Sequence, residues 1–430
     1  MMTKKISAGY CFGVMLCFMM SIFLRFLTQN ILIEIVHINN TFTQAVFFDR
    51  PLYIVPVTIN WAKLYPFQGI RNGSVHTTVL DSFTGKITNI EKKIEQYTTE
   101  LLVNRVFFVE TAAGYEKMLG WNLHETVIDL GDGFITEQVK QVDVQPPATA
   151  LVEFNDFLKD LNIDLLYVQS PHKICKYDTV AGLSDFSNQN ADELLHALDS
   201  RHIPHLDLRE YIHEQQLDHH SLFYKTDHHW KAETGLWATK IIGAYLNTHN
   251  GFAIDTSIFD PDRYRYEVYK NWFLGSIGKK VTLMRTQPED ISLMYPLWDT
   301  NLTLQIPSLQ IDTQGTFDIV YGYDRITKID YYNLSPYGAY IYGDNPITII
   351  HNNLSQDGKK VLFIKDSFVN VVDPFCALGV ENVEVVDIRH FTGSVQTYIE
   401  QSKPDIVIVM YNPSAINMDT STHRATFDFR

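Results

Sequence analysis

The stretch Val361-Leu362-Phe363-Ile364-Lys365-Asp366-Ser367-Phe368 decides the fold of this chain. Its first four residues form an uninterrupted apolar run, which is typical of a parallel β-strand buried on both faces. The polar residues that follow predict the end of that strand, and residues 368–378 are expected to form a helix. Ligands of parallel sheets bind where the strands end. Ser367 is therefore predicted to lie at the binding edge of a sheet.

The same alternation of apolar runs and amphipathic segments continues on both sides of this stretch. Strands are expected at residues 163–170, 205–208, 361–365, 383–387 and 406–410. Helices are expected at residues 148–161, 191–201, 232–246, 368–378 and 394–402. This rhythm predicts an α/β fold whose parallel sheet is covered by helices on both faces.

Two regions do not follow this rhythm. Residues 250–350, rich in Tyr, Asp, Thr and Pro, are expected to be an insertion with a short strand at 280–284. Ahead of residue 145, a helix is expected at 91–103 and a strand at 105–110. Because Gln145-Pro146-Pro147 marks a boundary, we expect two units. These are an N-terminal region over residues 28–145 and a larger domain over residues 146–420.

The N-terminus carries a candidate membrane anchor. Residues 6–24 are apolar or small and uncharged, a run long enough for a helix that crosses a bilayer. Lys4 and Lys5 precede it, which predicts a cytoplasmic N-terminus, and no Ala-x-Ala cleavage site follows. We expect a cytoplasmic tail over residues 1–5, a single uncleaved anchor over residues 6–27 and an extracytoplasmic remainder.

The part expected outside the membrane is acidic. Residues 1–29 hold three basic residues and no acidic one, so the rest has 32 basic and 50 acidic residues and a formal charge of −18. This balance argues against nucleic acid as a partner. Cys175 and Cys376 fall in this part and could pair, but two cysteines do not make a disulfide scaffold.

A candidate catalytic set combines Ser367 with the stretch Tyr224-Lys225-Thr226-Asp227-His228-His229-Trp230. A serine hydroxyl is a weak nucleophile until a base accepts its proton, and a third group must orient that base. His229 is the candidate base and Asp227 the orienting acid, while His228 is an alternative base and the adjoining tryptophan is expected to pack. Plainer interpretations also exist, namely a loop histidine beside a helix-start acid and a serine that caps a helix.

A metal site is the other interpretation of the histidine-rich region. Imidazole and carboxylate groups are ordinary ligands of zinc and manganese. No spacing matches a helix-borne His-x-x-x-His pair, so we expect neither a metal nor another cofactor. The residues concerned are His213, Asp218, His219, His220, Asp227, His228 and His229.

Taken together, these motifs resemble those of the DHHW family, within the larger group of alginate O-acetyltransferase-like SGNH hydrolases. The resemblance covers about residues 130–420 and extends in layout to the N-terminal anchor. The motifs that carry it are Tyr224-Lys225-Thr226-Asp227-His228-His229-Trp230, Phe273-Leu274-Gly275-Ser276-Ile277-Gly278, Tyr342-Gly343-Asp344-Asn345, Lys365-Asp366-Ser367-Phe368, Asp387-Ile388-Arg389-His390-Phe391 and Asp405-Ile406-Val407-Ile408-Val409-Met410-Tyr411-Asn412.

The resemblance implies an SGNH-like, flavodoxin-like sheet with its catalytic motifs in permuted order, because the Asp-x-His pair precedes the serine. It makes Ser367 the nucleophile, His229 the base and Asp227 the orienting acid. Enzymes of this fold use an asparagine in the oxyanion hole, and Asn412 is the candidate here. Arg389 is an alternative donor.

Tyr411, next to that asparagine, is a further candidate for substrate binding. The implied activity is extracytoplasmic O-acetyl transfer to a cell-surface or exported polysaccharide, through an acyl ester on the serine. A multi-pass membrane O-acyltransferase is the implied partner that delivers the acyl group. Two alternatives remain open: a carbohydrate acetyl esterase of the same fold, and a catalytically silent, anchored glycan-binding or assembly protein.

Overall fold

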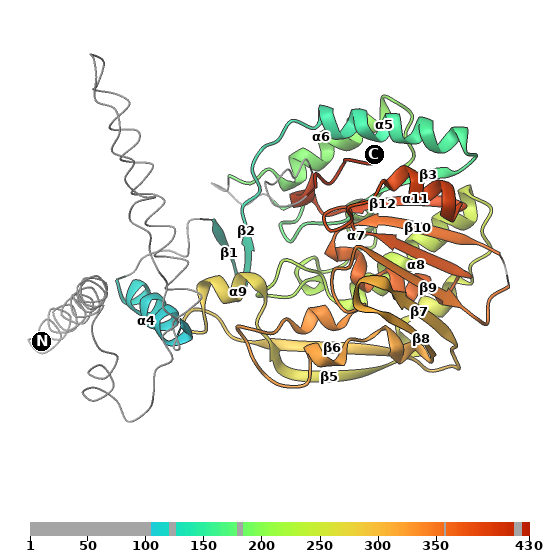
Figure 1. Ribbon diagram of the computed structural model, residues 1–430. Helices are drawn as coiled ribbons and strands as arrows, with labels where there is room; N and C mark the ends of the chain where they lie inside the picture. Colours follow the sequence, from blue (N-terminus) through green and yellow to red (C-terminus); the bar gives the residue numbers. More distant parts are fainter. Residues whose placement is uncertain (1–104, 120–125, 179–183, 357, 417–423) are drawn as a thin grey trace, which may run out of the picture. The chain divides into compact units, whose positions relative to one another are not determined.

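The computed structural model (Figure 1) describes five segments of the chain, residues 105–119, 126–178, 184–356, 358–416 and 424–430. The anchor expected at residues 6–27 and the helix expected at residues 91–103 lie outside the described residues. Within the described segments, no helix combines the length and the apolar character needed to cross a membrane.

The described segments contain the following elements. The helices are α4 (Arg105–Met118), α5 (Gln145–Asp160), α6 (Ser187–Asp199), α7 (Leu208–Glu214), α8 (Ala232–His249), α9 (Ser276–Val281), α10 (Asp373–Cys376) and α11 (Val395–Ser402). The strands are β1 (Val127–Gly131), β2 (Phe134–Glu137), β3 (Asp164–Gln169), β4 (His205–Asp207), β5 (Tyr264–Phe273), β6 (Glu289–Pro296), β7 (Leu302–Ile306), β8 (Ile311–Gly315), β9 (Ile347–Asn352), β10 (Lys360–Lys365), β11 (Asn382–Val386) and β12 (Ile406–Tyr411).

An eight-stranded sheet forms the centre of this part of the chain. Its strand order is β4-β3-β12-β10-β11-β9-β7-β8. The first five strands in this order are parallel to one another, whereas β9, β7 and β8 pair in antiparallel fashion. The α/β fold is therefore confirmed, and the expectation of a purely parallel sheet is wrong at one edge.

The antiparallel edge comes from the region expected to be an insertion. In β7, Leu302, Leu304 and Ile306 are buried, while the intervening Thr303 and Gln305 are partly exposed. This alternation is typical of an antiparallel strand with one solvated face. The strands β7, β8 and β9 therefore extend the main sheet, and only the β5–β6 hairpin within that region forms a separate two-stranded sheet.

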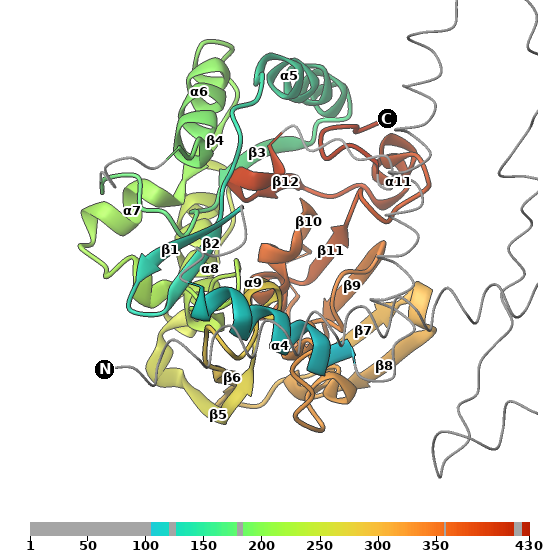
Figure 2. The same cartoon turned by 90° about the vertical axis from the view of Figure 1, so that its left-hand side faces the viewer.

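Two apolar cores lie on opposite faces of the sheet, which confirms that helices cover both faces. Val361 and Phe363 of β10 belong to the core shared with α8 and α10. Leu362 and Ile364 belong to the core shared with α5, α6 and α11, and Figure 2 shows α5 and α6 at its top. Successive residues of a strand face opposite sides, so a strand covered on both faces needs the uninterrupted apolar run seen here.

Three local predictions are wrong. Residues 105–110, expected as a strand, begin helix α4, which shows the context dependence of strand propensity. Residues 280–284, expected as a strand, instead include the end of α9. The single helix expected at residues 368–378 is divided into a 3-10 turn, Ser367–Val371, and α10. Pro374 has no N–H with which to continue a helix from the preceding turn.

Candidate active site

Ser367 lies directly after β10, at the carboxyl end of the parallel strands. It is the first residue of the 3-10 turn, and Asp366 caps that turn because its Oδ1 accepts a hydrogen bond from the N–H of Phe368 at 2.9 Å. The capping role that the sequence also allowed for Ser367 is thus filled by its neighbour. The serine hydroxyl makes its contact elsewhere.

The Asp-x-His pair lies in a closed loop that leads into α8. Phe223 and Trp230 face each other as an antiparallel bridge, and the N–H of Tyr224 donates to the carbonyl of His229 at 3.2 Å. The indole of Trp230 is fully buried, which agrees with the packing role expected for it. Its Nε1–H donates to the carbonyl of Phe368 at 2.9 Å and so ties this loop to the serine turn.

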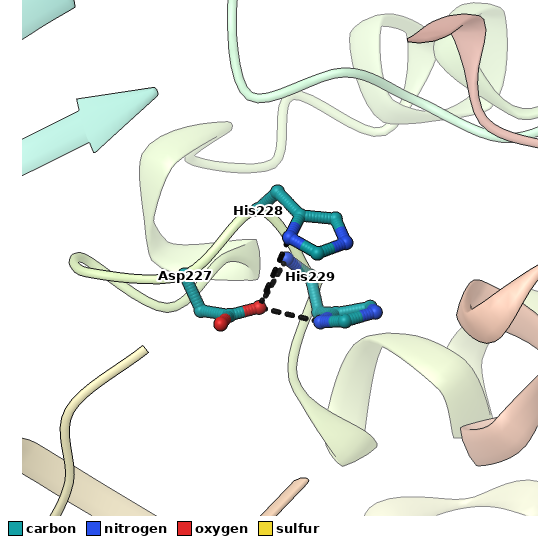
Figure 3. Close-up of side chains that lie close together, drawn as sticks. All are labelled: Asp227, His228 and His229. Carbon is teal, nitrogen blue, oxygen red and sulfur yellow. Dashed lines mark hydrogen bonds and ion pairs between the residues drawn. The ribbon is translucent and has the colours of Figure 1, made fainter. Parts of the chain in front are cut away.

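The side chains of Ser367, His229 and Asp227 form a hydrogen-bonded line. His229 Nδ1 lies 2.5 Å from Oδ1 of Asp227 (Figure 3), and His229 Nε2 lies 2.6 Å from Oγ of Ser367. With its proton assigned to Nδ1, the imidazole donates to the carboxylate and accepts from the serine hydroxyl. The structure thus brings together the three predicted residues in the order that proton transfer from serine requires.

The carboxylate of Asp227 is held in its ionised form. Burial favours the neutral acid, but His229, His228 and a hydrogen bond from the backbone N–H of Ser276 together lower the pKa of Asp227 well below its usual value. The N–H of Ser276 lies 2.6 Å from Oδ2 of Asp227. An anionic Asp227 can stabilise the imidazolium that forms when His229 accepts a proton.

Gly275 allows the backbone that carries the N–H of Ser276 to pack closely against Asp227. A Cβ atom at position 275 would lie 2.3 Å from the Cβ of Asp227 and 2.5 Å from its Cα. Any side chain there would therefore displace the loop. This close approach gives the motif at residues 273–278 a structural role: it places the N–H of Ser276 against the carboxylate.

Tyr337 fixes the imidazole from the other side. Its ring stacks on His229, with 3.9 Å between the ring centroids and an angle of 15° between the planes. Its hydroxyl donates to the carbonyl of Ser367 at 3.0 Å, and burial raises the pKa of Tyr337 well above its usual value, so the phenol stays neutral. Neither Ser276 nor Tyr337 was a candidate from the sequence, because their roles depend on contacts between segments distant in the chain.

His228, the alternative base, faces a different direction. Its Nδ1 lies 3.1 Å from Oγ of Ser276 and 3.5 Å from Oδ1 of Asp227. Ligand atoms of Asp227, His228 and His229 lie within 4.8 Å of one another, as a small metal site would require. Both ring nitrogens of His229 already face Asp227 and Ser367, however, so this geometry favours His229 as the base.

The other histidines considered as metal ligands make different contacts. Nε2 of His219 lies 2.8 Å from the carbonyl oxygen of His172. His220 stacks on Phe134 and His213 stacks on Tyr177. Among the described residues, these three histidines therefore do not join Asp227, His228 and His229 in one ligand group.

Asn412 supports the serine turn from the end of β12. Its backbone N–H and its side-chain Nδ2 both donate to Oδ2 of Asp366, at 2.7 and 2.6 Å. Its Oδ1 accepts a hydrogen bond from the N–H of Ser414 at 2.9 Å. The contacts of Asn412 thus fix the residue that caps the Ser367 turn, and its role as an oxyanion donor stays a prediction.

Arg389 belongs to a network of charges at the ends of β10 and β11. Its guanidinium donates to both carboxylate oxygens of Asp387, at 2.9 and 2.6 Å, and to Asp344 at 3.0 Å. Nζ of Lys365 donates to Asp344 at 2.8 Å. Because paired guanidinium and carboxylate groups bind strongly, the guanidinium of Arg389 already has two acidic partners, and its donor role also stays a prediction.

Tyr411 points into the core on the other face of the sheet. Its ring is fully buried and its hydroxyl donates to the carbonyl of Thr426 at 2.5 Å. Phe368, beside the serine, belongs to the opposite core. The contacts of Tyr411 are therefore those of a packing residue. The two cysteines that could pair, Cys175 and Cys376, are both free.

The fold and this geometry define an α/β protein with a serine after a central parallel strand and an Asp-x-His pair beside it. Residues 178–386 match the model of a protein family described as DHHW protein. This match confirms the DHHW family expected from the sequence, and its range includes Asp227, His229 and Ser367. No curated protein matches the chain.

Solved structures share the fold. Bacillus cereus PatB1 with a sulfonyl adduct is 20% identical, with a TM-score of 0.58, and the match covers 71% of this chain and 98% of PatB1. A second PatB1 structure gives 19% identity, a TM-score of 0.58 and coverages of 71% and 99%. A DHHW family protein from Eubacterium siraeum is 16% identical, with a TM-score of 0.52 and coverages of 68% and 92%.

Proposed function

We propose that this protein is a membrane-anchored, extracytoplasmic O-acetyltransferase that modifies a cell-surface or exported polysaccharide through an acyl ester on Ser367. The observation that carries the proposal is the contact of 2.6 Å between Ser367 Oγ and His229 Nε2, with Asp227 at 2.5 Å on the other ring nitrogen. A serine in this arrangement can attack an acyl carbonyl, because the imidazole takes its proton as the bond forms.

The reaction has two halves. In the first, Oγ of Ser367 bonds to the acyl carbon, His229 takes the hydroxyl proton and passes it to the leaving group, and the bond to the acyl donor breaks. In the second, a sugar hydroxyl gives its proton to His229 and bonds to the acyl carbon. The ester to Ser367 then breaks, and the serine recovers that proton.

The developing negative charge on the acyl oxygen needs hydrogen-bond donors. The backbone N–H of Ser367 is the first candidate, since it begins the turn and has no acceptor among the described residues. Asn412 remains the second candidate. Its Nδ2 carries two hydrogens, and one is used by Asp366.

Two features of the sequence support the location and the partner. The apolar run after Lys4-Lys5 supports a single-pass anchor with the domain outside the membrane. The resemblance to alginate O-acetyltransferase-like proteins supports a multi-pass acyltransferase as acyl donor. A C-terminal reporter that is active only in the cytoplasm should be silent, and strong activity would contradict the proposed location.

The test uses the full-length protein in detergent micelles with a chromogenic acetyl ester, with and without an acceptor oligosaccharide. Acetylated oligosaccharide that appears with wild type and not with Ser367→Ala supports transfer. Release of acetate alone, unchanged by the acceptor, supports the esterase alternative. Absence of both reactions, with retained glycan binding, supports the silent protein.

A sulfonyl fluoride gives a second measurement that needs no acceptor. PatB1 carries a sulfonyl adduct in one of its structures, and activated serines react with sulfonyl fluorides by forming a sulfonate ester and releasing fluoride. We expect the added mass on the peptide that contains Ser367. The His229→Ala variant should remain unlabelled, since its serine has no base.

A further inference from the structure

A buried lysine lies beneath the loop that carries Asp227. Lys173 follows β3 and is only 1% exposed. Its Nζ donates to the carbonyl of Ile135 at 2.7 Å, to the carbonyl of Lys225 at 3.2 Å and, by a short contact, to the carbonyl of Asp227. All three protons of one ammonium group are thus used on backbone carbonyls, two of them in the catalytic loop.

A partly buried glutamate accepts hydrogen bonds from the N–H groups of the same loop. Oε2 of Glu289, at the start of β6, accepts from the N–H of Lys225 at 2.7 Å. Its Oε1 accepts from both the N–H and the hydroxyl of Thr226, each at 2.7 Å. Lys173 and Glu289 come from segments more than 100 residues apart. Together they bind the carbonyls of residues 225 and 227 and the N–H groups of residues 225 and 226.

We propose that Lys173 and Glu289 act as a two-sided clamp that positions Asp227 for its contact with His229. The inference rests on the proposed function, because it assigns a positioning role for that same reaction. The reason is geometric. The backbone of residue 227 sets where its carboxylate lies, and small displacements of a catalytic group cost large factors in rate.

Lys173 itself does not take part in the chemistry. Its ammonium group is enclosed by the three carbonyls, so no substrate atom can reach it. The charged groups that face it are Asp227 of the loop and Glu289 of β6. Burial lowers the pKa of Lys173 to about 8, while these two carboxylates oppose that shift.

A double-mutant cycle on the full-length protein tests the clamp. Lys173→Met keeps the length of the side chain and removes its charge and donors, and we expect a loss of about 10²-fold in kcat. If the lysine acts through Asp227, the same change in an Asp227→Asn background should cost little more. Losses that multiply in the double variant would overturn the proposal.

The matched control is Lys176→Met. Lys176 lies in the same segment but is partly exposed, and it pairs with Glu210 at 2.6 Å and Asp192 at 2.9 Å. Its substitution should leave the rate unchanged in both backgrounds. If Lys173→Met does not fold, Glu289→Gln replaces it in the double-mutant cycle, because its side-chain NH₂ would face the N–H donors of the loop. Its loss in kcat should likewise not add to that of Asp227→Asn.

A spectroscopic readout separates failure of the clamp from failure of the proposed function. A proton shared between Nδ1 of a histidine and a carboxylate gives a far-downfield NMR resonance, which requires no substrate. This resonance should be present in wild type and in Lys176→Met, and lost or shifted in Lys173→Met and Glu289→Gln. A resonance that is unchanged in folded clamp variants overturns the inference, whether or not the protein transfers acetyl groups.

Discussion

Nε1–H of Trp230 donates to the carbonyl of Phe368 at 2.9 Å, across 138 residues of sequence. This bond joins the loop that carries Asp227 and His229 to the turn that carries Ser367. A buried donor left without its partner costs about 1–3 kcal/mol. This contact of a fully buried side chain thus holds the two halves of the site together.

The first prediction concerns Ser367 and His229. Ser367→Ala and His229→Ala should each lower kcat by roughly 10³-fold or more, and the double variant should be little worse than either, because residues that act as a unit show non-additive losses. Asp227→Asn should cost less, and His228→Ala should be milder than His229→Ala. Ester turnover and circular dichroism of each variant provide the measurements. A folded Ser367→Ala variant with full activity would end the serine mechanism.

The second prediction concerns metal dependence. Both nitrogens of His229 already have partners in Asp227 and Ser367, so activity should survive dialysis against a strong chelator. The measurement is ester turnover before and after dialysis. Loss of activity that zinc or manganese restores would show that the histidines are ligands.

The third prediction concerns Gly275. Gly275→Ala places a Cβ within 2.3 Å of Asp227, so the loop must move, and we expect a fall in kcat of about 10²-fold. The control is Gly243→Ala in α8, where the added Cβ would meet its nearest neighbours at an ordinary 3.5 Å and helix propensity favours alanine. Comparable activity of the two folded variants would contradict the role of the close approach.

The fourth prediction concerns the alkaline side of the pH profile. Burial lowers the pKa of Lys173 to about 8. Above that pH its amine has two protons for three carbonyls, so kcat should fall. Unfolding through this group does not explain the fall. The folded pKa of Lys173 lies below its ordinary value of 10.5, so the unfolded chain binds more protons between pH 8 and 10.5, and the free energy of unfolding rises with pH there.

Lys173→Arg keeps its charge throughout this range. In a folded Lys173→Arg variant, the alkaline limb should therefore move to higher pH. Identical alkaline limbs in the variant and in wild type would contradict the assignment to Lys173.

The fifth prediction concerns Asp373, which is fully buried and has no hydrogen-bond partner for either carboxyl oxygen among the described residues. Burial raises its pKa from 3.8 to about 8. Between these values the folded protein holds a proton that the unfolded chain has released, so the free energy of unfolding falls as pH rises. Asp373→Asn carries no such proton. The free energy of unfolding of Asp373→Asn, relative to that of wild type, should therefore increase as the pH rises from 4 to 8, by at most about 1.4 kcal/mol per pH unit.

Urea denaturation of both proteins at several pH values between 4 and 8 measures this difference. A constant difference across the range would show that Asp373 does not titrate in the folded protein. Asp192→Asn, at an exposed carboxylate paired with Arg209, gives the control for an acid at the surface.

Local pattern was sufficient to predict the central strands and the position of the serine. The apolar run at residues 361–364 is buried from both faces, and a polar turn follows it, so the strand end and Ser367 are readable without the rest of the chain. The helices α5, α6 and α8 were predictable for the same reason, because periodicity is a property of neighbouring residues. The Asp-x-His pair is likewise local, since residues 227 and 229 meet within one loop.

The tertiary structure decided everything that depends on which distant segment lies beside which. Strand order made β7, β8 and β9 an antiparallel edge of the main sheet, although their residues precede the central strand and looked like an insertion. Packing of distant segments made Asp366 the hydrogen-bond partner of Asn412. It also placed Lys173 and Glu289 against the catalytic loop. A sequence motif specifies a donor or an acceptor, whereas its partner is set by the close packing of segments that can be hundreds of residues apart.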